Sequence, residues 1–176
     1  MSYIVIDVEA DGPIPSLYSM VSFGAVIVEP TLSKTFYGKV KPISTNFIPE
    51  ALAVSNISRE EHFTYEEASI VMINFFNWVK DNSNGRPIFI SDNPAFDYQW
   101  INFYFHAFTS LGNPFGHSAR RIGDLYCGMK MDTGLNHEWK KKLRKTKHTH
   151  NPVDDAMGNA EALLAMKSMG LKINLT

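Results

Sequence analysis

Short apolar runs separated by turns open the chain and predict strands. The run from Tyr3 to Val8 is β-branched and aromatic with little alternation, which is typical of a strand buried on both faces. Two further runs, Met20–Val28 and Thr35–Val40, are separated by a turn at residues 29–31. Three strands in direct succession predict an antiparallel meander.

Apolar positions at helical spacing follow these strands. We expect the helix to begin at an N-cap, Thr64, and to end within residues 82–85. Its apolar face consists of Ala68, Val71, Met72, Phe75, Phe76 and Val79. The run Arg86–Ser91 then predicts a fourth, buried strand. Because a helix separates it from the third strand, it should be parallel to a neighbour.

The second half of the chain is predicted to be mainly helical. Helices are expected at residues 93–110, Ile122–Lys130 and Pro152–Met169. Residues 41–59 predict a long connection with short helical turns around Pro49–Val54. Strands and helices in this order indicate a single α/β domain over residues 1–176, with a meander and parallel strands in one mixed sheet flanked by helices.

Composition fits one globular domain and adds a local charge feature. The chain has 176 residues, 44% of them hydrophobic, and a formal net charge of -1. Six of its 17 basic residues fall within eight positions: Lys140, Lys141, Lys142, Arg144, Lys145 and Lys147. A lone cysteine, Cys127, excludes an internal disulfide. With no basic, apolar leader and no apolar run of about 20 residues, we expect a cytoplasmic protein and no membrane.

Four carboxylates lie at the ends of predicted elements. Asp7 and Glu9 are two residues apart in a strand and therefore point to the same face. Asp97 falls in the first turns of the helix after the fourth strand, and Asp155 lies in the last helix. Clustered carboxylates repel one another unless they take up protons or bind hard cations. Oxygen-only ligation favours Mg²⁺ or Mn²⁺, and two such ions could support phosphodiester hydrolysis.

The stretch from His150 to Ala156 has a purely structural interpretation as well. Asn151 is a good N-cap, Pro152 suits the first helical position, and acids there are favoured by the helix dipole. The same stretch places an imidazole, His150, just before the helix that carries Asp155. An imidazole can accept a proton near neutral pH, so His150 is the candidate general base, with His148 as the alternative.

Three segments together resemble a known family. Asp7-Val8-Glu9, the segment Asn93–Asp97, and His150 with Asp155 look like the three motifs of the DEDDh 3′-5′ exonucleases, which include proofreading subunits, oligoribonuclease and RNase T. The resemblance spans residues 3–170 and implies an RNase H-like fold. Size and the stretch Phe115–Cys127 suggest the branch of small bacterial and phage 3′-5′ exoribonucleases.

The resemblance implies a role for each acid. Asp7 would bridge two metal ions, Glu9 and Asp155 would hold the ion on the nucleophile side, and Asp97 would hold the other. His150 would orient and deprotonate the attacking water. Asp154 is a neighbouring candidate, but the family spacing from His150 selects Asp155.

Contacts to nucleic acid are the less specific part of the prediction. The candidates are Gly12, Asn93, Phe96, Arg120, Arg121, Lys145 and Lys147. A basic loop before His150 would attract a phosphate backbone, although such a run is usually a solvated face. Arg120 and Arg121 could equally form structural ion pairs. Where many relatives have threonines before the glycine, this chain has Ala10 and Asp11, which puts contacts from that loop in doubt.

The predicted function is a two-metal 3′-5′ exonuclease. It would act on the 3′ end of single-stranded nucleic acid, with RNA somewhat favoured over DNA, and release nucleoside monophosphates. Relatives are often homodimers, so a homodimer is possible here too. The alternatives are a catalytically inactive nucleic-acid-binding module of the same fold, and a hydrolase of dinucleotides.

Overall fold

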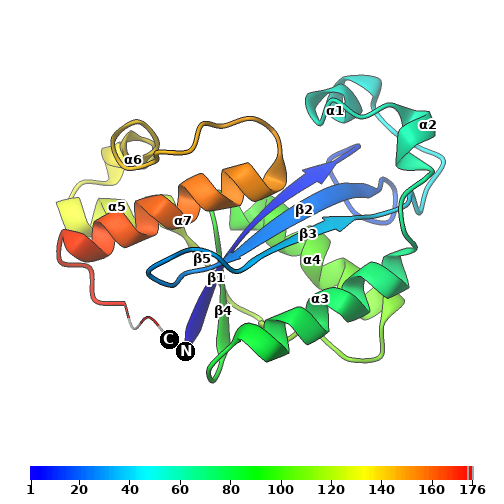
Figure 1. The fold of residues 1–176 in the computed structure, drawn as a ribbon. Coiled ribbons are helices and arrows are strands. Elements are labelled where there is room, and N and C mark those ends of the chain that lie inside the picture. Colours follow the sequence, from blue (N-terminus) through cyan, green and yellow to red (C-terminus); the bar gives the residue numbers. More distant parts are fainter. Residues whose placement is uncertain (174, 176) are drawn as a thin grey trace.

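A mixed five-stranded sheet forms the centre of the computed structural model, which describes residues 1–173 and 175 (Figure 1). The strand order is β3-β2-β1-β4-β5. The bounds are β1 Ser2–Ala10, β2 Met20–Ile27, β3 Thr35–Lys39, β4 Pro87–Ser91 and β5 Ala119–Arg121. The first four strands lie where the sequence predicts them. β5, with three residues, is too short to show a hydrophobic period and was not predicted.

The directions of the strands confirm the predicted mixed sheet. β1, β2 and β3 form an antiparallel meander, and β4 runs parallel to β1. β5 extends the sheet parallel to β4. β1 is thus the central strand, and only the sheet interior accounts for its nearly uninterrupted burial.

The helices cover both faces of this sheet and confirm most of the predicted bounds. They are α1 Pro49–Val54, α2 Arg59–His62, α3 Ala68–Asn82, α4 Pro94–Phe108, α5 Ile122–Lys130, the 3₁₀ turn η1 Thr133–Leu135, α6 Glu138–Lys142 and α7 Pro152–Ser168. Among the described residues, no helix is long and apolar enough to cross a membrane.

The expected N-cap at Thr64 is wrong. α3 begins at Ala68, and the residue before it, Glu67, makes no side-chain capping bond. The Thr64 hydroxyl instead donates to the carbonyl of Glu61, at the end of α2. This hydroxyl therefore bonds to the short helix α2, which the sequence did not reveal, and is not available to cap α3.

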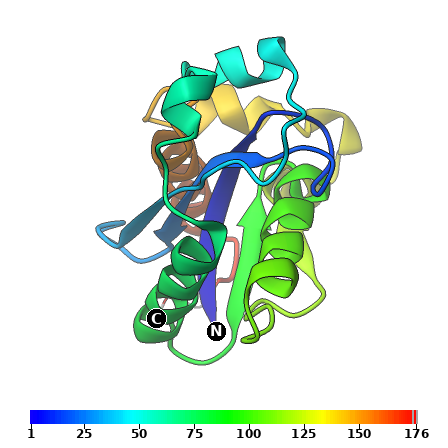
Figure 2. The same ribbon diagram turned by 90° about the vertical axis from the view of Figure 1, so that its right-hand side faces the viewer.

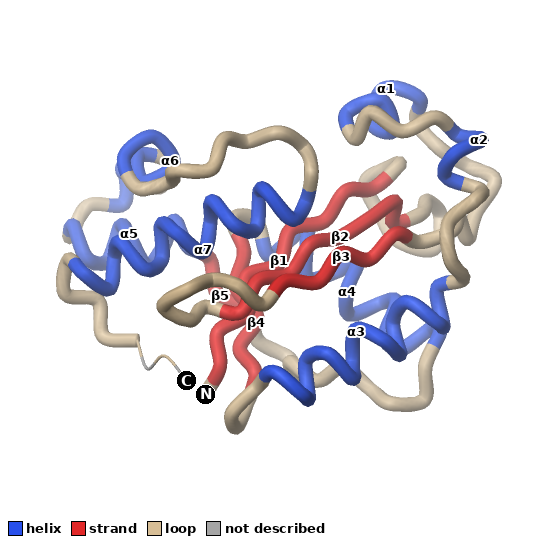
Figure 3. The backbone as a smooth tube through the Cα atoms, in the orientation of Figure 1, coloured by secondary structure: helices blue, strands red, loops and turns tan. Residues whose placement is uncertain are grey.

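Alternation along β1 divides the core into two layers. Ile4, Ile6 and Val8 pack with α3 and α4, whereas Tyr3 and Val5 pack with α5, α6 and α7. Figures 1 and 2 show these two helix groups on opposite faces of the sheet, and Figure 3 shows the sheet passing between them. Odd-numbered positions of β1 therefore face α7, which decides where its two acids point.

Residues 41–63 are fastened to the loop after β1 by a buried ion pair. Arg59 Nη1 lies 2.6 Å from Asp11 Oδ2, and the backbone N–H of Ser19 donates to Asp11 Oδ1 at 2.5 Å. The guanidinium also lies over the rings of Phe47 and Phe63. This pair holds α1 and α2 above the C-terminal end of β1 (Figure 1).

Candidate active site

Asp7 and Glu9 continue the face of β1 that α7 covers. Tyr3 and Val5 begin this row as packing residues, and at the C-terminal end of the strand the row becomes acidic. Both acids are only partly buried, so they border the surface. The same alternation that buries the core thus places two carboxylates side by side at its edge.

A missing side chain on β2 lets α7 approach these acids. Gly24 is the partner of Asp7 in the antiparallel register. A Cβ at Gly24 would overlap the backbone of Pro152 and Val153, so the first turn of α7 rests directly on the sheet there. The predicted cap is confirmed, because the Asn151 side chain accepts bonds from the N–H groups of the first turn.

Asp155 completes a three-carboxylate cluster. One carboxylate oxygen from each of Asp7, Glu9 and Asp155 lies within 4.8 Å of the other two. Asp155 is 1% exposed, so it closes the inner side of the cluster. Oxygen ligands at this spacing suit Mg²⁺ or Mn²⁺ better than softer metals.

Asp97 reaches the cluster from the other layer of the molecule. It lies in the first turn of α4, whose first helical residue, Pro94, needs no amide donor. Its Oδ1 accepts a bond from the N–H of Val8 at 3.1 Å, which ties α4 to the strand beside Asp7. After burial, the Asp97 carboxylate is the largest influence on the pKa of Asp7, so the two charges are close.

The acids shift one another's protonation strongly. Burial, followed by repulsion from Asp97, Glu9 and Asp155, raises the pKa of Asp7 well above its usual range. Burial and the neighbouring acids raise the pKa of Glu9 to about 8. Burial raises the pKa of Asp97 to about 7, against the lowering effect of hydrogen bonds from its surroundings. The cluster therefore favours taking up protons or cations.

The segment before α7 wraps around Asp155. Arg144 Nη2 lies 3.0 Å from Oδ1, to which the N–H of Thr149 donates at 3.3 Å. His148 Nδ1 lies 2.9 Å from Oδ2, to which the N–H of His150 donates at 3.1 Å. A carboxylate offers about four lone-pair sites, so these four donors saturate Asp155.

The sequence did not reveal the role of Arg144. Its side chain is 8% exposed and lies across α7 at Gly158, where a Cβ would overlap the guanidinium. Arg144 also lowers the pKa of Asp7, although its effect is the smallest among the named influences. The sequence shows Gly158 fourteen residues after Arg144 but does not show that they touch. That contact can be recognised only once the packing of the helix is known.

His150 lies at the open side of the cluster. Its Nδ1 is 3.8 Å from Glu9 Oε1, and its side chain is 48% exposed. Its φ of 59° is in the left-handed region, where a non-glycine residue is uncommon and often functional. His148, with its ring centroid 4.4 Å away, faces Asp155 instead. The geometry therefore favours His150 over His148 as the group beside an incoming water.

Two sequence comparisons decide the family. The model of the 3′-5′ exoribonuclease Rv2179c-like domain matches residues 2–166. The chain belongs to this family. It is also 38% identical over 131 residues to the 3′-5′ DNA exonuclease Cap18 of Escherichia coli, covering 72% of this chain and 68% of that protein. This member of the Rv2179c-like family is accordingly a 3′-5′ exonuclease, a hydrolase of phosphodiester bonds, which confirms the resemblance to the DEDDh group.

Solved structures agree on the fold of this Rv2179c-like domain. The nuclease domain of 3′hExo, a DEDDh family member bound to rAMP, superposes with a TM-score of 0.79 at 17% identity, covering 99% of this chain and 96% of that one. E. coli exonuclease I in complex with a dT13 oligonucleotide gives 0.67 at 14% identity, covering 96% of this chain and 41% of that one.

Two of the predicted nucleic-acid contacts on the strand side make structural contacts. Gly12 lies against the ring of Tyr18, which a Cβ would overlap. Arg120 stacks on Tyr3 and donates to its hydroxyl at 3.0 Å. Tyr3 is four residues before Asp7 on β1, or roughly 13 Å away at about 3.3 Å per residue. The structure therefore does not bring Arg120 to the carboxylates.

The remaining candidates divide between the site and the surface. Asn93 and Arg121 line a cleft of about 420 Å³ at the start of α4. Phe96 is partly buried against Trp100. The N–H of Lys145 donates to Glu161, two turns along α7 from Asp155, and Lys147 is exposed. Asn93, Phe96 and Arg121 thus lie at or beside the start of α4, the helix that carries Asp97.

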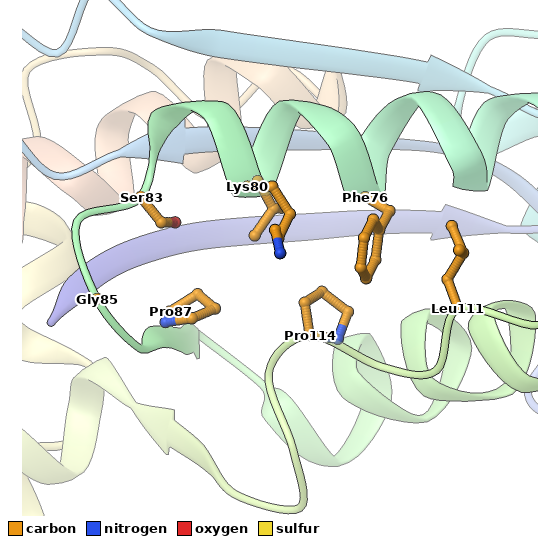
Figure 4. A pocket seen from close by; sticks show the side chains of 8 residues that line it. Phe76, Lys80, Ser83, Gly85, Pro87, Leu111 and Pro114 are labelled. Atoms are coloured by element: carbon orange, nitrogen blue, oxygen red, sulfur yellow. The ribbon is translucent and has the colours of Figure 1, made fainter.

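A larger apolar cavity lies far from this chemistry. Phe76, Leu111, Pro87 and Pro114 line a space of about 470 Å³, with Lys80 and Ser83 at its edge (Figure 4). Pro87 pairs with Ser2, at the start of β1, whereas the acids lie at the end of that strand. The cavity is therefore not part of the active site.

Proposed function

We propose that the four carboxylates hold two divalent ions, Mg²⁺ or Mn²⁺, and that the site hydrolyses the 3′-terminal phosphodiester bond of single-stranded nucleic acid. The observation that carries this proposal is the convergence of Asp7, Glu9 and Asp155 within 4.8 Å, with Asp97 beside them. When bound, such ions generate a nucleophile near neutral pH and stabilise the attacking and leaving oxygens. The products would be nucleoside 5′-monophosphates.

The positions of the acids suggest how they divide the work. Asp7, whose carboxylate is repelled by those of Asp97, Glu9 and Asp155, would help to hold both ions. Glu9 and Asp155 would hold the ion nearer the open side. His150, beside Glu9, would orient the attacking water and accept its proton. The strand would enter along the cleft at the start of α4, where Arg121 and Asn93 line the wall.

The comparisons disagree on the sugar of the substrate. The family model describes exoribonucleases, whereas the E. coli relative is described as a DNA exonuclease. We keep RNA as the preferred substrate on the family description, and single strands because a compact site admits few nucleotides. Digestion of matched RNA and DNA strands with single-stranded, duplex and 3′-overhang ends measures both preferences. Faster DNA digestion would overturn the preference for RNA.

Cellular setting and assembly complete the proposal. Cys127 is buried and unpaired, which suits a reducing compartment, so we place the protein in the cytoplasm. We propose a homodimer because relatives are often homodimers. Light scattering, which measures the mass of the protein in solution, would confirm or refute it.

Two substitutions test the mechanism. Asp7→Ala should abolish Mg²⁺- or Mn²⁺-dependent release of mononucleotides from a 3′-labelled strand, and unchanged release would refute the metal site. His150→Ala should lose activity yet still bind the divalent ion. Tight binding of nucleic acid without turnover under any divalent ion would instead support the inactive binding module.

The dinucleotide alternative has its own comparison. A hydrolase of dinucleotides needs a closed end beyond the second nucleotide, so its rate falls sharply on longer strands. The proposed exonuclease should cleave an oligomer of ten nucleotides at least as fast as a dinucleotide, because the cleft at the start of α4 is open at the surface.

A further inference from the structure

A second group of metal-ligating atoms lies next to the carboxylate cluster and includes a residue with no part in the proposed catalysis. His148, His150 and Asp155 each offer one ligand atom within 4.8 Å of the others. His148 Nδ1 is already 2.9 Å from Asp155 Oδ2, and the two imidazole rings lie 4.4 Å apart, centre to centre. Both histidine side chains are about half exposed, so an ion can reach them.

The donor set of this group suits a different class of metal from the carboxylates. Two imidazole nitrogens and one carboxylate oxygen are typical ligands of Zn²⁺, whereas Mg²⁺ prefers oxygen alone. Ligands of a tetrahedral zinc at about 2.0 Å lie about 3.3 Å from one another. The separation of 2.9 Å between His148 and Asp155 is already close to that value.

We propose that His148, His150 and Asp155 form a Zn²⁺ site that inhibits the exonuclease. Glu9 Oε1, 3.8 Å from His150 Nδ1, is placed to supply a fourth ligand. The zinc site itself needs only these side chains. Its inhibitory effect rests on the proposed function, because it requires Asp155 and His150 to serve in catalysis.

The saturation of Asp155 makes the two metals mutually exclusive. Four hydrogen-bond donors occupy its carboxylate, so an ion that binds only oxygen ligands must displace one of them. The donor most easily displaced is His148, because its side chain is the most exposed among them. Zn²⁺ has no such conflict, because it binds His148 and Asp155 together and replaces only the proton between them. Mg²⁺ thus separates His148 from Asp155, whereas Zn²⁺ binds both side chains at once.

Zinc at this position would stop the reaction in two ways. It would occupy the imidazole nitrogen with which His150 accepts a proton, and it would occupy the Asp155 oxygen that faces His148, which the catalytic ions could then no longer use. Nothing would need to unfold, so removing the metal should restore activity completely. The family pattern requires only one histidine before the aspartate, and His148 is the addition that creates the site.

Binding is tested on the full chain without substrate. Chelator-stripped protein is titrated with Zn²⁺ against a chromophoric competitor, and with Co²⁺ while the visible spectrum of the tetrahedral ion is followed. His148→Asn and His150→Asn should each weaken binding at least about tenfold. The matched control is His106→Asn, which removes an exposed histidine on α4 and should bind as the wild type does. Wild-type affinity in His148→Asn, with His148→Gln agreeing, would overturn the site.

Inhibition is tested separately at a fixed excess of Mg²⁺. Each variant is compared with its own rate in the absence of Zn²⁺, which removes any effect of the substitution on catalysis. Zn²⁺ should inhibit the wild type at concentrations near its binding constant, and His148→Asn should require at least about ten times more. Protein that binds Zn²⁺ but hydrolyses nothing would refute the exonuclease and leave the zinc site standing. Hydrolysis inhibited equally in both proteins would refute the zinc site alone.

Discussion

Asp7, which is partly buried, and Asp11, which is fully buried, are acids only four residues apart with opposite surroundings. Asp11 is 0% exposed and has a guanidinium partner, Arg59, at 2.6 Å, along with an amide donor. Asp7 has three other carboxylates around it, and Arg144 acts against them as the weakest of the named influences. The Arg59 guanidinium neutralises Asp11, whereas the charge of Asp7 can be neutralised by a proton or a metal ion.

This difference separates structural from functional acids by their partners, since burial alone does not. Burial raises the pKa of both side chains. For Asp11, the Ser19 amide and the Arg59 guanidinium then lower the pKa again, whereas for Asp7 the neighbours raise it further. A buried acid whose nearest neighbours are also acids is a candidate metal ligand.

The largest expected effect is on the Asp11 side. Arg59→Met should lower the free energy of unfolding by about 3–5 kcal/mol, because it leaves a buried carboxylate without its cation. Urea denaturation measures the change. Arg121→Met removes a guanidinium whose partner Asp124 is 70% exposed, and it should change stability by less than about 1 kcal/mol. Equal effects of the two substitutions would contradict the structural role of the Asp11 pair.

Replacing an acid of the carboxylate cluster should have the opposite effect on stability, and it should also slow the reaction. Asp97→Asn should reduce the rate on a 3′-labelled strand at least about 100-fold, because even groups that only support a metal ligand are worth roughly 10–100-fold. The same substitution should raise the stability of the metal-free protein at pH 8, since it removes a charge whose burial is unfavourable. Asp81→Asn, at an exposed position of α3 outside the cleft at the start of α4, is the control and should change neither quantity.

Gly24 lets the first turn of α7 rest on β2, and it should therefore control the position of Asp155. Gly24→Ala should lower stability by about 1–3 kcal/mol, because the new Cβ overlaps the start of α7. It should also slow hydrolysis at least about tenfold, since Asp155 moves with that turn. Gly128→Ala is the same change in open space and should leave the rate unaltered. A rate loss without a stability loss in Gly24→Ala would place the effect elsewhere.

The smallest expected effect is a pH dependence of stability that comes from two acids of the carboxylate cluster, Glu9 and Asp97. The pKa is about 8 for Glu9 and about 7 for Asp97, both above the values of an unfolded chain. Folded protein thus holds more protons than unfolded protein between about pH 4 and pH 8. Without divalent ions, the Tm should fall as pH rises through this window. Added Mg²⁺ should restore it most at the upper end, and Asp97→Asn should flatten the profile.

The sequence predicted the acids well because each lies on an element with a clear pattern. Asp7 and Glu9 share a face through simple alternation, and Asn151 with Pro152 marks the helix start that positions Asp155. What it could not predict are contacts between distant elements. Gly24 and Gly158 carry no local signal, because each glycine makes room for a group from another segment.

The partners of Asp155 were missed for a related reason. The basic run that contains Arg144 predicts a solvated, nucleic-acid-binding loop, yet its arginine is buried against α7 and the N–H of Lys145 donates to Glu161. Charge patterning describes a segment as a whole, whereas burial is decided for each side chain.

The distance along the chain between Asp7 and Asp155 sets the earliest moment during synthesis at which the carboxylate cluster can form. A ribosome adds about 5–20 residues per second, so roughly 7–30 s separate the two carboxylates during synthesis. Through that interval the emerging chain carries Asp7 and Glu9 but lacks the helix that completes their cluster. A nuclease built in this order cannot complete its carboxylate cluster until almost all of its own fold exists.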